Sequence, residues 1–232
     1  GKYPQHDLSF FLENNSGKFK NVTNGIADFQ LGMITDAKWG DINGDGTKEM
    51  VVVGEWMSPT ILEWKNEGFT VSHKEGSLKN AVGWWWTLEI ADVNGDGLND
   101  LVAGNIGANN KFHPNTDHPL RVYGNDFDNN GTNDVVLSKK YKGKFVPTRG
   151  RECSSEQMPF VKEKFKNFES FSQAKIEEVL GEAMNDALFY ESQEFRSGVF
   201  INQGDFDFKF EPFDNYAQLS AIKAFQVSDF SG

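Results

Sequence analysis

The chain has 232 residues, of which 38% are hydrophobic and 14% aromatic, and this is enough to bury a sizeable core. It carries 34 acidic against 23 basic residues, so the net charge is −11 at pH 7. This charge argues against a nucleic-acid partner, which favours a basic face. No run approaches the ~18 consecutive apolar residues of a membrane-spanning helix, so the sequence predicts a chain that does not span a membrane.

The first predicted element is a β-hairpin. Its two apolar strands, residues 8–12 and 18–23, are separated by residues 13–17, a run that contains Asn, Ser and Gly. Short strands joined through such turn-forming residues are typical of a hairpin.

The next segment, residues 35–73, contains an acidic loop between predicted strands. Loop 1, residues 41–49, has oxygen-bearing side chains at positions 1, 3, 5 and 9 and a glycine at position 6. This spacing curls a short loop around a hard cation, because the side chains and the carbonyl of position 7 supply oxygen ligands. A β-branched run leads out of the loop, and residues 59–64 and 69–71 form a second predicted hairpin. The predicted ligands of loop 1 are Asp41, Asn43, Asp45, Thr47 and Glu49.

A second copy of the loop follows a strand that is rich in tryptophan. The predicted strand covers residues 83–91, and loop 2 covers residues 92–100 with the same spacing. Residues 104–110 are rich in turn-forming residues and are predicted to be a surface loop. The predicted ligands of loop 2 are Asp92, Asn94, Asp96, Leu98 and Asp100.

The three consecutive tryptophans have two interpretations. In a strand, Trp84 and Trp86 share one face and Trp85 takes the other. The run can be a platform on which a sugar stacks, or it can be core packing in an inner strand that is buried on both faces. Packing is the favoured interpretation, and Trp85 stays a candidate ligand residue.

Loop 3 covers residues 126–134, and a fourth copy opens at Asp229 and stops at Gly232, where the sequence ends. The three complete loops hold nine of the acidic residues, and the other acidic and basic residues nearly balance. The loops can be hydrogen-bonded turns without a metal, but nine acids at ligand positions would repel one another without a cation. Calcium is therefore favoured over a turn without metal. A structural role is favoured over catalytic calcium, because the loops connect strands and closed coordination by the protein leaves little room for a substrate. The predicted ligands of loop 3 are Asp126, Asp128, Asn130, Thr132 and Asp134.

Residues 151–191 interrupt the strand pattern. Apolar residues recur there at spacings of mostly three to five with charges between them, and this predicts an amphipathic helical hairpin inserted between strands. Pro159 suits a first helical position, Ser172 an N-cap and Gly181 a C-cap. Three further strands are predicted after the insertion, at residues 197–202, 206–213 and 221–227.

Charged residues gather where this insertion begins. Arg149 and Arg151, with Glu152 and Glu156, can be a solvated helix end or an arginine pair that recognises an anionic group. The helix end is favoured, and both arginines stay candidate ligand residues. Cys153 is the only cysteine and forms no intramolecular disulfide, and a buried or merely tolerated thiol is favoured over a nucleophile.

His113 and His118 are the only histidines close enough in sequence to suggest a pair, and the prolines between them predict a loop without a metal.

The residues after each acidic loop exclude a helix–loop–helix EF-hand. Such a hand needs a bidentate Glu at position 12, where this chain has Val52, Ala103 and Leu137. Short β-branched runs follow each loop, so the loops are predicted to join strand to strand.

This strand–loop–strand pattern resembles the FG-GAP/VCBS repeat family, whose calcium loops build β-propellers such as the integrin α-subunit head. Residues 149–160, with Gly83–Trp85 and residues 104–107, resemble bacterial VCBS-repeat proteins related to cartilage acidic protein. The departures are Glu49 for the usual Asp at position 9, Asn130 at position 5, and the incomplete fourth loop.

The resemblance implies an all-β fold, a β-propeller segment over residues 1–232 with about four blades and a helical insertion over 151–191. The first hairpin would be the outer half of a blade, so that the chain begins in mid-blade. Strand edges left open would allow the chain to associate with itself.

The expected function is that of a calcium-binding module at a cell surface or in the periplasm, with Ca²⁺ bound and a protein or glycan as partner. Millimolar calcium outside the cytoplasm can fill sites of modest affinity. The alternatives are the scaffold of a polysaccharide-active enzyme and a structural spacer in a longer surface protein. An enzyme of that kind needs two carboxylates that face a cleft, and the clustered acids here are assigned to the loops, so we expect no enzyme.

Overall fold

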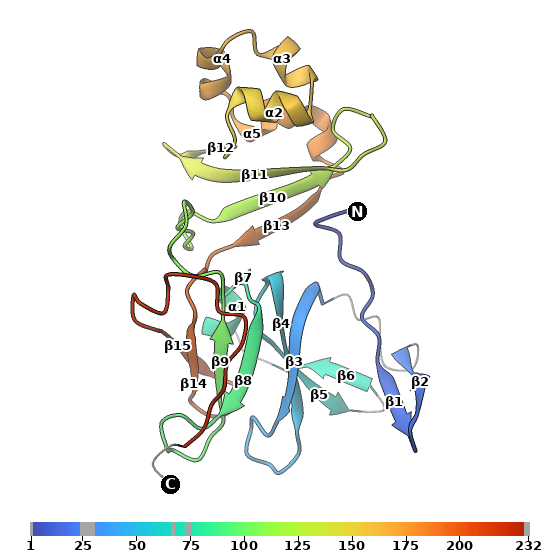
Figure 1. Cartoon of the computed structure of the whole chain (residues 1–232), viewed down its shortest axis with the longest axis vertical. Coiled ribbons are helices and arrows are strands. Elements are labelled where there is room, and N and C mark those ends of the chain that lie inside the picture. Colours follow the sequence, from blue (N-terminus) through green and yellow to red (C-terminus); the bar gives the residue numbers. More distant parts are fainter. Residues whose placement is uncertain (1, 24–30, 66–67, 73–75, 230–232) are drawn as a thin grey trace. The chain divides into compact units, whose positions relative to one another are not determined.

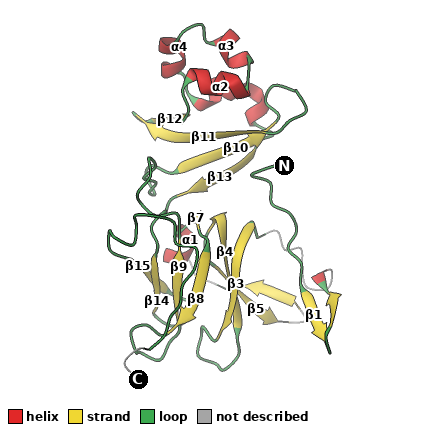
Figure 2. Ribbon diagram, in the orientation of Figure 1, coloured by secondary structure: helices red, strands yellow, loops and turns green. Residues whose placement is uncertain are grey.

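The structure, a computed structural model, describes residues 2–23, 31–65, 68–72 and 76–229. The chain divides into two compact units (Figure 1). The main unit comprises Asp7–His113 and Ser192–Gly232, and the helical unit comprises Gly1–His6 and Pro114–Glu191. Strands dominate the described residues, and every sheet is antiparallel (Figure 2). Among these residues, no helix is long and apolar enough to cross a membrane.

The first sheet of the main unit is built around strand β4. Its strand order is β3 (Met33–Gly40), β4 (Glu49–Met57), β5 (Thr60–Lys65) and β6 (Gly68–Val71), and β7 (Gly83–Trp84) also pairs with β4. The hairpin predicted at residues 59–71 is therefore confirmed as β5 and β6. Residues 66 and 67 of its turn lie outside the described part of the chain.

Strand β4 is buried on both faces, which explains its continuous apolar sequence. Val51 and Val53 point into one core cluster, whereas Met50 and Val52 belong to another. Successive side chains of a strand point to opposite faces, so an uninterrupted apolar run fits only a strand that is covered on both sides.

The second sheet of the main unit has the order β15 (Phe208–Pro212), β14 (Gly198–Asn202), β9 (Asp100–Gly104) and β8 (Thr87–Ala91). Leu101 and Phe200 of this sheet lie in the same core cluster as Val51 of the first sheet. The two sheets therefore share one core. Two of the strands predicted from sequence, at 197–202 and 206–213, are confirmed here as β14 and β15.

The tryptophan run links the two sheets instead of forming one strand. Trp84 ends β7, and the Trp85 N–H donates to Gly54 O at 3.2 Å in the first sheet. The Trp86 N–H donates to Gly104 O at 2.7 Å in the second sheet. The prediction of one continuous strand over 83–91 is therefore wrong, because the chain changes its pairing partner at Trp85.

The N-terminal hairpin forms with a shifted register. It consists of β1 (Leu12–Asn15) and β2 (Lys18–Asn21), so the strand predicted at 8–12 begins only at Leu12. Ser16 and Gly17 both have positive φ and make a tight two-residue turn. This turn is shorter than the predicted run 13–17, so the pairing extends closer to the turn and stops at Leu12 and Asn21.

Residues 221–227 form no strand, contrary to prediction. The segment passes the predicted loop 104–110, and the Ile222 N–H donates to Asn105 O at 3.0 Å. Asn105 is fully buried, so this part of the loop does not lie at the surface. Helix α1 (Ser77–Asn80) precedes β7. His73 and residues 230–232 of the fourth loop lie outside the described residues.

The helical unit places its helices on one face of a sheet (Figure 1). The sheet has the order β12 (Lys144–Pro147), β11 (Asp134–Tyr141), β10 (Leu120–Asn125) and β13 (Leu188–Ser192). Four short helices cover it: α2 (Arg151–Gln157), α3 (Phe160–Lys164), α4 (Phe168–Gln173) and α5 (Ile176–Leu180), followed by a 3-10 helix, η2 (Gly181–Met184). The core between sheet and helices includes Tyr123, Val136, Val161, Phe171 and Ile176.

The predicted helical hairpin is wrong in detail, because capping residues divide it into these short helices. Asn167 is the N-cap of α4 and its side chain accepts the Ser170 N–H at 2.8 Å, whereas Ser172 lies inside that helix. Pro159 is the N-cap of α3 and not its first residue. Gly181 is the C-cap of α5 with φ 64, as predicted. Residues 188–191, at the end of the predicted insertion, are strand, because β13 pairs with β10. The single propeller segment over 1–232 stays a prediction.

Candidate metal centre

Each acidic loop connects two adjacent antiparallel strands, so the strand-to-strand prediction is confirmed. Loop 1 joins β3 to β4, loop 2 joins β8 to β9, and loop 3 joins β10 to β11. The residue at position 9 is the first residue of the following strand in all three loops. It pairs with the last residue of the preceding strand, in the pairs Gly40 and Glu49, Ala91 and Asp100, and Asn125 and Asp134.

The acid at position 9 closes each loop. Its carboxylate is buried in all three loops and accepts the backbone N–H of position 2. The pairs, donor first, are Ile42 and Glu49 at 2.8 Å, Val93 and Asp100 at 2.9 Å, and Phe127 and Asp134 at 3.1 Å. Because Glu49 makes the same bond as the two aspartates, its extra methylene does not change the loop plan.

The acid at position 1 holds the other side of the loop. One of its oxygens accepts the N–H of the glycine at position 6: Gly46 to Asp41 at 2.9 Å, Gly97 to Asp92 at 2.8 Å and Gly131 to Asp126 at 2.8 Å. Position 5 accepts the N–H of position 7: Thr47 to Asp45 at 2.7 Å, Leu98 to Asp96 at 2.9 Å and Thr132 to Asn130 at 2.8 Å. Asn43 and Asn94, at position 3, accept the N–H of position 5, each at 2.9 Å. The loops therefore share one plan of hydrogen bonds.

Two positions of each loop need a left-handed backbone. The glycine at position 6 has φ between 85° and 89° in all three loops. Position 4 has positive φ as well, and loop 3 places Asn129 there with φ 58. Asn tolerates this region better than other residues that carry a side chain. Gly44 and Gly95 at position 4 are therefore a second sequence signal of this loop, beside the glycine at position 6.

Loop 3 brings its acids together. Ligand oxygens of Asp126, Asp128 and Asp134 lie within 4.8 Å of one another, the only such set of three among the described residues. Calcium is bound by six to eight oxygen ligands. The carboxylates of these three residues supply oxygen only, so they fit the ion. The cluster can hold a metal ion such as Ca²⁺.

The electrostatics of loop 3 favour a cation. Burial raises the pKa of Asp134, and the negative charges of Asp128 and Asp126 raise this pKa further, whereas the Phe127 N–H lowers it. A raised carboxyl pKa means that the negative charge is poorly compensated. A bound cation would supply the missing compensation.

In loops 1 and 2, the carboxyl pKa is raised at position 9 of loop 1 and lowered at other positions. Burial raises the pKa of Glu49, and hydrogen bonds from Gly97 and other backbone N–H groups lower the pKa of Asp92. The Thr47 N–H, first of several causes, lowers the pKa of Asp45. Within the described chain, the acids of loops 1 and 2 are not gathered as closely as those of loop 3.

Asn202, at the end of β14, connects loops 1 and 2 and was missed by the sequence analysis. Its buried side-chain amide donates to Ile42 O at 2.8 Å and to Asn99 O at 2.9 Å. Its backbone N–H donates to Asp100 Oδ1 at 2.8 Å. The only sequence signal was an asparagine at a strand end, which gives no hint of partners 160 and 103 residues away.

The asparagine at position 8 has a related role in two loops. Asn99 donates to Asp41 O at 2.8 Å, and Asn133 donates to Tyr3 O at 2.7 Å. Loop 2 is thus anchored on loop 1, and loop 3 is anchored on the N-terminal segment of its own unit.

Trp85 and Arg151, two candidate ligand residues outside the loops, are both buried in the structure. Trp85 is fully buried, and its Nε1 donates to Ala81 O at 2.9 Å, so it offers no face to a sugar. Arg151 is buried and donates to Phe165 O at 2.6 Å and to Lys162 O at 3.3 Å, which ties α2 to α3.

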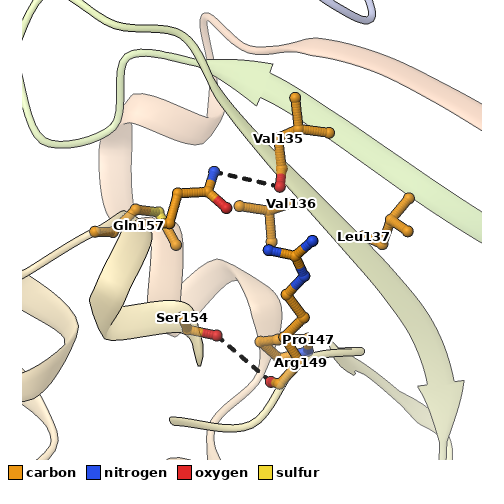
Figure 3. Close-up of a pocket in the computed structure, with 8 residues that line it drawn as sticks. Val135, Val136, Leu137, Pro147, Arg149, Ser154 and Gln157 are labelled. Atoms are coloured by element: carbon orange, nitrogen blue, oxygen red, sulfur yellow. Dashed lines mark hydrogen bonds between the residues drawn. The ribbon is translucent and has the colours of Figure 1, made fainter. Parts of the chain in front are cut away.

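Arg149 is exposed, and its side chain lies over β11 (Figure 3). The structure therefore does not form the arginine pair that the sequence suggested.

Cys153 is free and exposed on α2. The prediction of a buried thiol is therefore wrong, and a merely tolerated thiol remains the favoured interpretation. His113 and His118 belong to no set of three metal-ligating side chains among the described residues.

Comparison with protein families gives one match. Residues 41–103 match the family described as FG-GAP-like repeat. The match begins at loop 1, includes loop 2 and ends in β9, so this part of the chain is an FG-GAP-like repeat. Comparison with curated proteins and with solved structures gives no significant match.

Proposed function

We propose that this chain is a calcium-binding β-propeller repeat module. The carboxylate cluster of Asp126, Asp128 and Asp134 carries the proposal, because it supplies only oxygen ligands within 4.8 Å. The hydrogen-bond plan shared by the three loops supports calcium in loops 1 and 2 as well. An FG-GAP-like repeat over residues 41–103 agrees with this assignment.

The proposal names the ligands that would hold each ion. In loop 3 they are the side chains of Asp126, Asp128, Asn130 and Asp134 with the Thr132 carbonyl. Loops 1 and 2 would use the corresponding positions 1, 3, 5, 7 and 9. The bound ion supplies positive charge, and its role is structural because the carboxylates are held between strands and against backbone N–H groups.

The sheets support the assignment of propeller blades. Each acidic loop joins neighbouring strands of one antiparallel sheet, and the sheets have four strands with β7 added to one of them. Propeller blades are four-stranded sheets of this kind. We take the first sheet of the main unit, β3 to β6, as one complete blade.

The role that we propose for the module is binding or adhesion at a cell surface or in the periplasm. The partner is a protein or a carbohydrate, and calcium outside the cytoplasm fills the loops. We propose binding rather than catalysis because the clustered carboxylates already accept loop N–H groups. The outer strands of the sheets also offer edges for association with a second copy.

A calcium titration tests the proposal directly. Isothermal calorimetry with wild type and with Asp126→Asn should show one fewer site in the variant, because an amide weakens the oxygen set and removes a charge. A protein that binds no calcium would contradict the proposal. Glycan and protein binding screens, run with calcium and with EDTA, then test the partner class.

A further inference from the structure

An open cleft of about 380 Å³ adjoins loop 3 in the helical unit. Its polar lining includes Asn130 and Thr132 from the loop, with Arg149 and Gln157 from the start of the helical segment. Val135 and Leu137 of β11 supply apolar surface. This volume lies within the ~300–1,000 Å³ of ordinary ligand pockets.

Arg149 is the only basic residue in the lining of the cleft. Its guanidinium makes no hydrogen bond or ion pair with any other described residue. Figure 3 shows the Arg149 and Gln157 side chains pointing toward one another above β11, and the Gln157 amide donates to Val135 O at 3.4 Å. A guanidinium has five donors in a planar fork that matches a carboxylate, so this group is available for an anion.

The sequence around Arg149 is basic although the whole chain is acidic. Residues 138–175 contain ten Lys and Arg against four Asp and Glu. A local excess of positive charge raises the concentration of anionic ligands near the surface. The net charge of −11 therefore hides a basic segment that includes Arg149.

The rest of the lining favours a sugar over a peptide. A pyranose presents hydroxyl groups around its rim and C–H groups on its faces. The amide of Asn130, the hydroxyl of Thr132 and the amide of Gln157 can exchange hydrogen bonds with hydroxyls. Val135 and Leu137 offer apolar contact for a C–H face.

The carboxylates of loop 3 make anion binding depend on the cation. Asp134 lines the cleft and belongs to the cluster of three acids. Without a cation these charges repel a carboxylate, and a divalent ion removes most of that repulsion.

We propose that the cleft binds a carboxylate-bearing sugar, a hexuronate, when loop 3 holds its cation. Arg149 pairs with the sugar carboxylate, and the amides and hydroxyl bind the sugar hydroxyls. This inference rests on the calcium binding and the carbohydrate partner that are proposed above. Because binding linkage is reciprocal, the sugar also tightens calcium binding by the factor by which calcium tightens sugar binding.

The test is an NMR titration of the full ¹⁵N-labelled chain with D-glucuronate at saturating calcium. We expect saturable shifts at the amides of Asn130, Thr132 and Gln157, no such shifts with D-glucose, and binding at least tenfold weaker in EDTA. Arg149→Ala should weaken glucuronate binding about tenfold. Arg149→Lys should bind glucuronate with an affinity between those of wild type and Arg149→Ala, because lysine keeps the positive charge but lacks the planar fork of donors.

Lys166→Ala is the matched control. Lys166 is exposed in the same unit and lies outside the lining of the cleft, so its variant removes the same charge. It should bind glucuronate as wild type does. An equal loss in Lys166→Ala and Arg149→Ala would mean general attraction and would overturn the proposal.

Two other results would also overturn the proposal, and they separate it from the proposed function. Calcium binding is measured first without sugar, so calcium binding with no glucuronate shifts contradicts the cleft and leaves the calcium module intact. N-acetyl-aspartate that binds as tightly as glucuronate would exclude a sugar site. If the chain binds no calcium, both proposals are wrong, and the calcium titration without sugar identifies that result.

Discussion

At the scale of single residues, the same side chains offer oxygen to a cation and hold the loop in shape. Asp126 accepts backbone N–H groups of Asn130 and Gly131, and Asp134 accepts the Phe127 N–H. These bonds fix the carboxylates before any ion arrives, which reduces the ordering that binding requires. The carboxylate cluster of loop 3, which can hold a metal ion, is therefore largely preformed.

Asn202→Ala tests the connection between loops 1 and 2. The variant removes two side-chain donors and leaves the carbonyls of Ile42 and Asn99 without them, so we expect the free energy of unfolding to fall by about 1–3 kcal/mol. Urea denaturation measures this loss. Asn215→Ala, at an exposed position, should change stability by less than about 0.5 kcal/mol. Equal stability of the two variants would contradict a bridging role for Asn202.

At the scale of elements, the short helices of the helical unit depend on the sheet. Each of α2 to α5 is too short to be stable alone in water. They are held by burial, because Val161, Phe171 and Ile176 pack with Tyr123 and Val136 of the sheet. The local capping residues set where each helix begins and ends, and the sheet supplies the stabilising contact.

Ile176→Ala tests this dependence. Ile176 is fully buried, so truncation should cost about 2–5 kcal/mol through lost burial and a cavity. We expect amide exchange of residues 151–184 to accelerate, while β4 and β9 of the main unit keep their protection. Phe168→Ala is the control, since Phe168 is 65% exposed. Unchanged exchange in Ile176→Ala would show that the helices are stable without this contact.

At the scale of the whole molecule, calcium should contribute to the stability of both units, because loops 1 and 2 lie in the main unit and loop 3 in the helical unit. An ion held at ~100 times its dissociation constant adds about 2.7 kcal/mol per site. Thermal melts in calcium should therefore exceed melts in EDTA by many degrees. Asp134→Asn should reduce the calcium effect on the helical unit alone. Equal melting temperatures with and without calcium would contradict the proposal that the loops bind calcium.

The sequence by itself determined the features that depend on local spacing. The three loops, the strands after them and the C-cap at Gly181 follow from residue patterns within about ten positions. Turn geometry and strand alternation act over such short distances, so they can be read directly from neighbouring residues. The assembled carboxylates of loop 3 belong to this group, because all three lie within nine residues of one another.

Only the tertiary structure decided the features that depend on distant partners. Trp85 changes sheets, Asn202 joins two loops, and Arg151 is buried among helix carbonyls while Arg149 lines a cleft. The segment 221–227 has a strand-like sequence but forms no strand in the described part of the chain. Whether an apolar or polar side chain packs, bridges or stays exposed depends on which segment lies opposite it. That pairing is set by the folded chain as a whole, and no local pattern contains it.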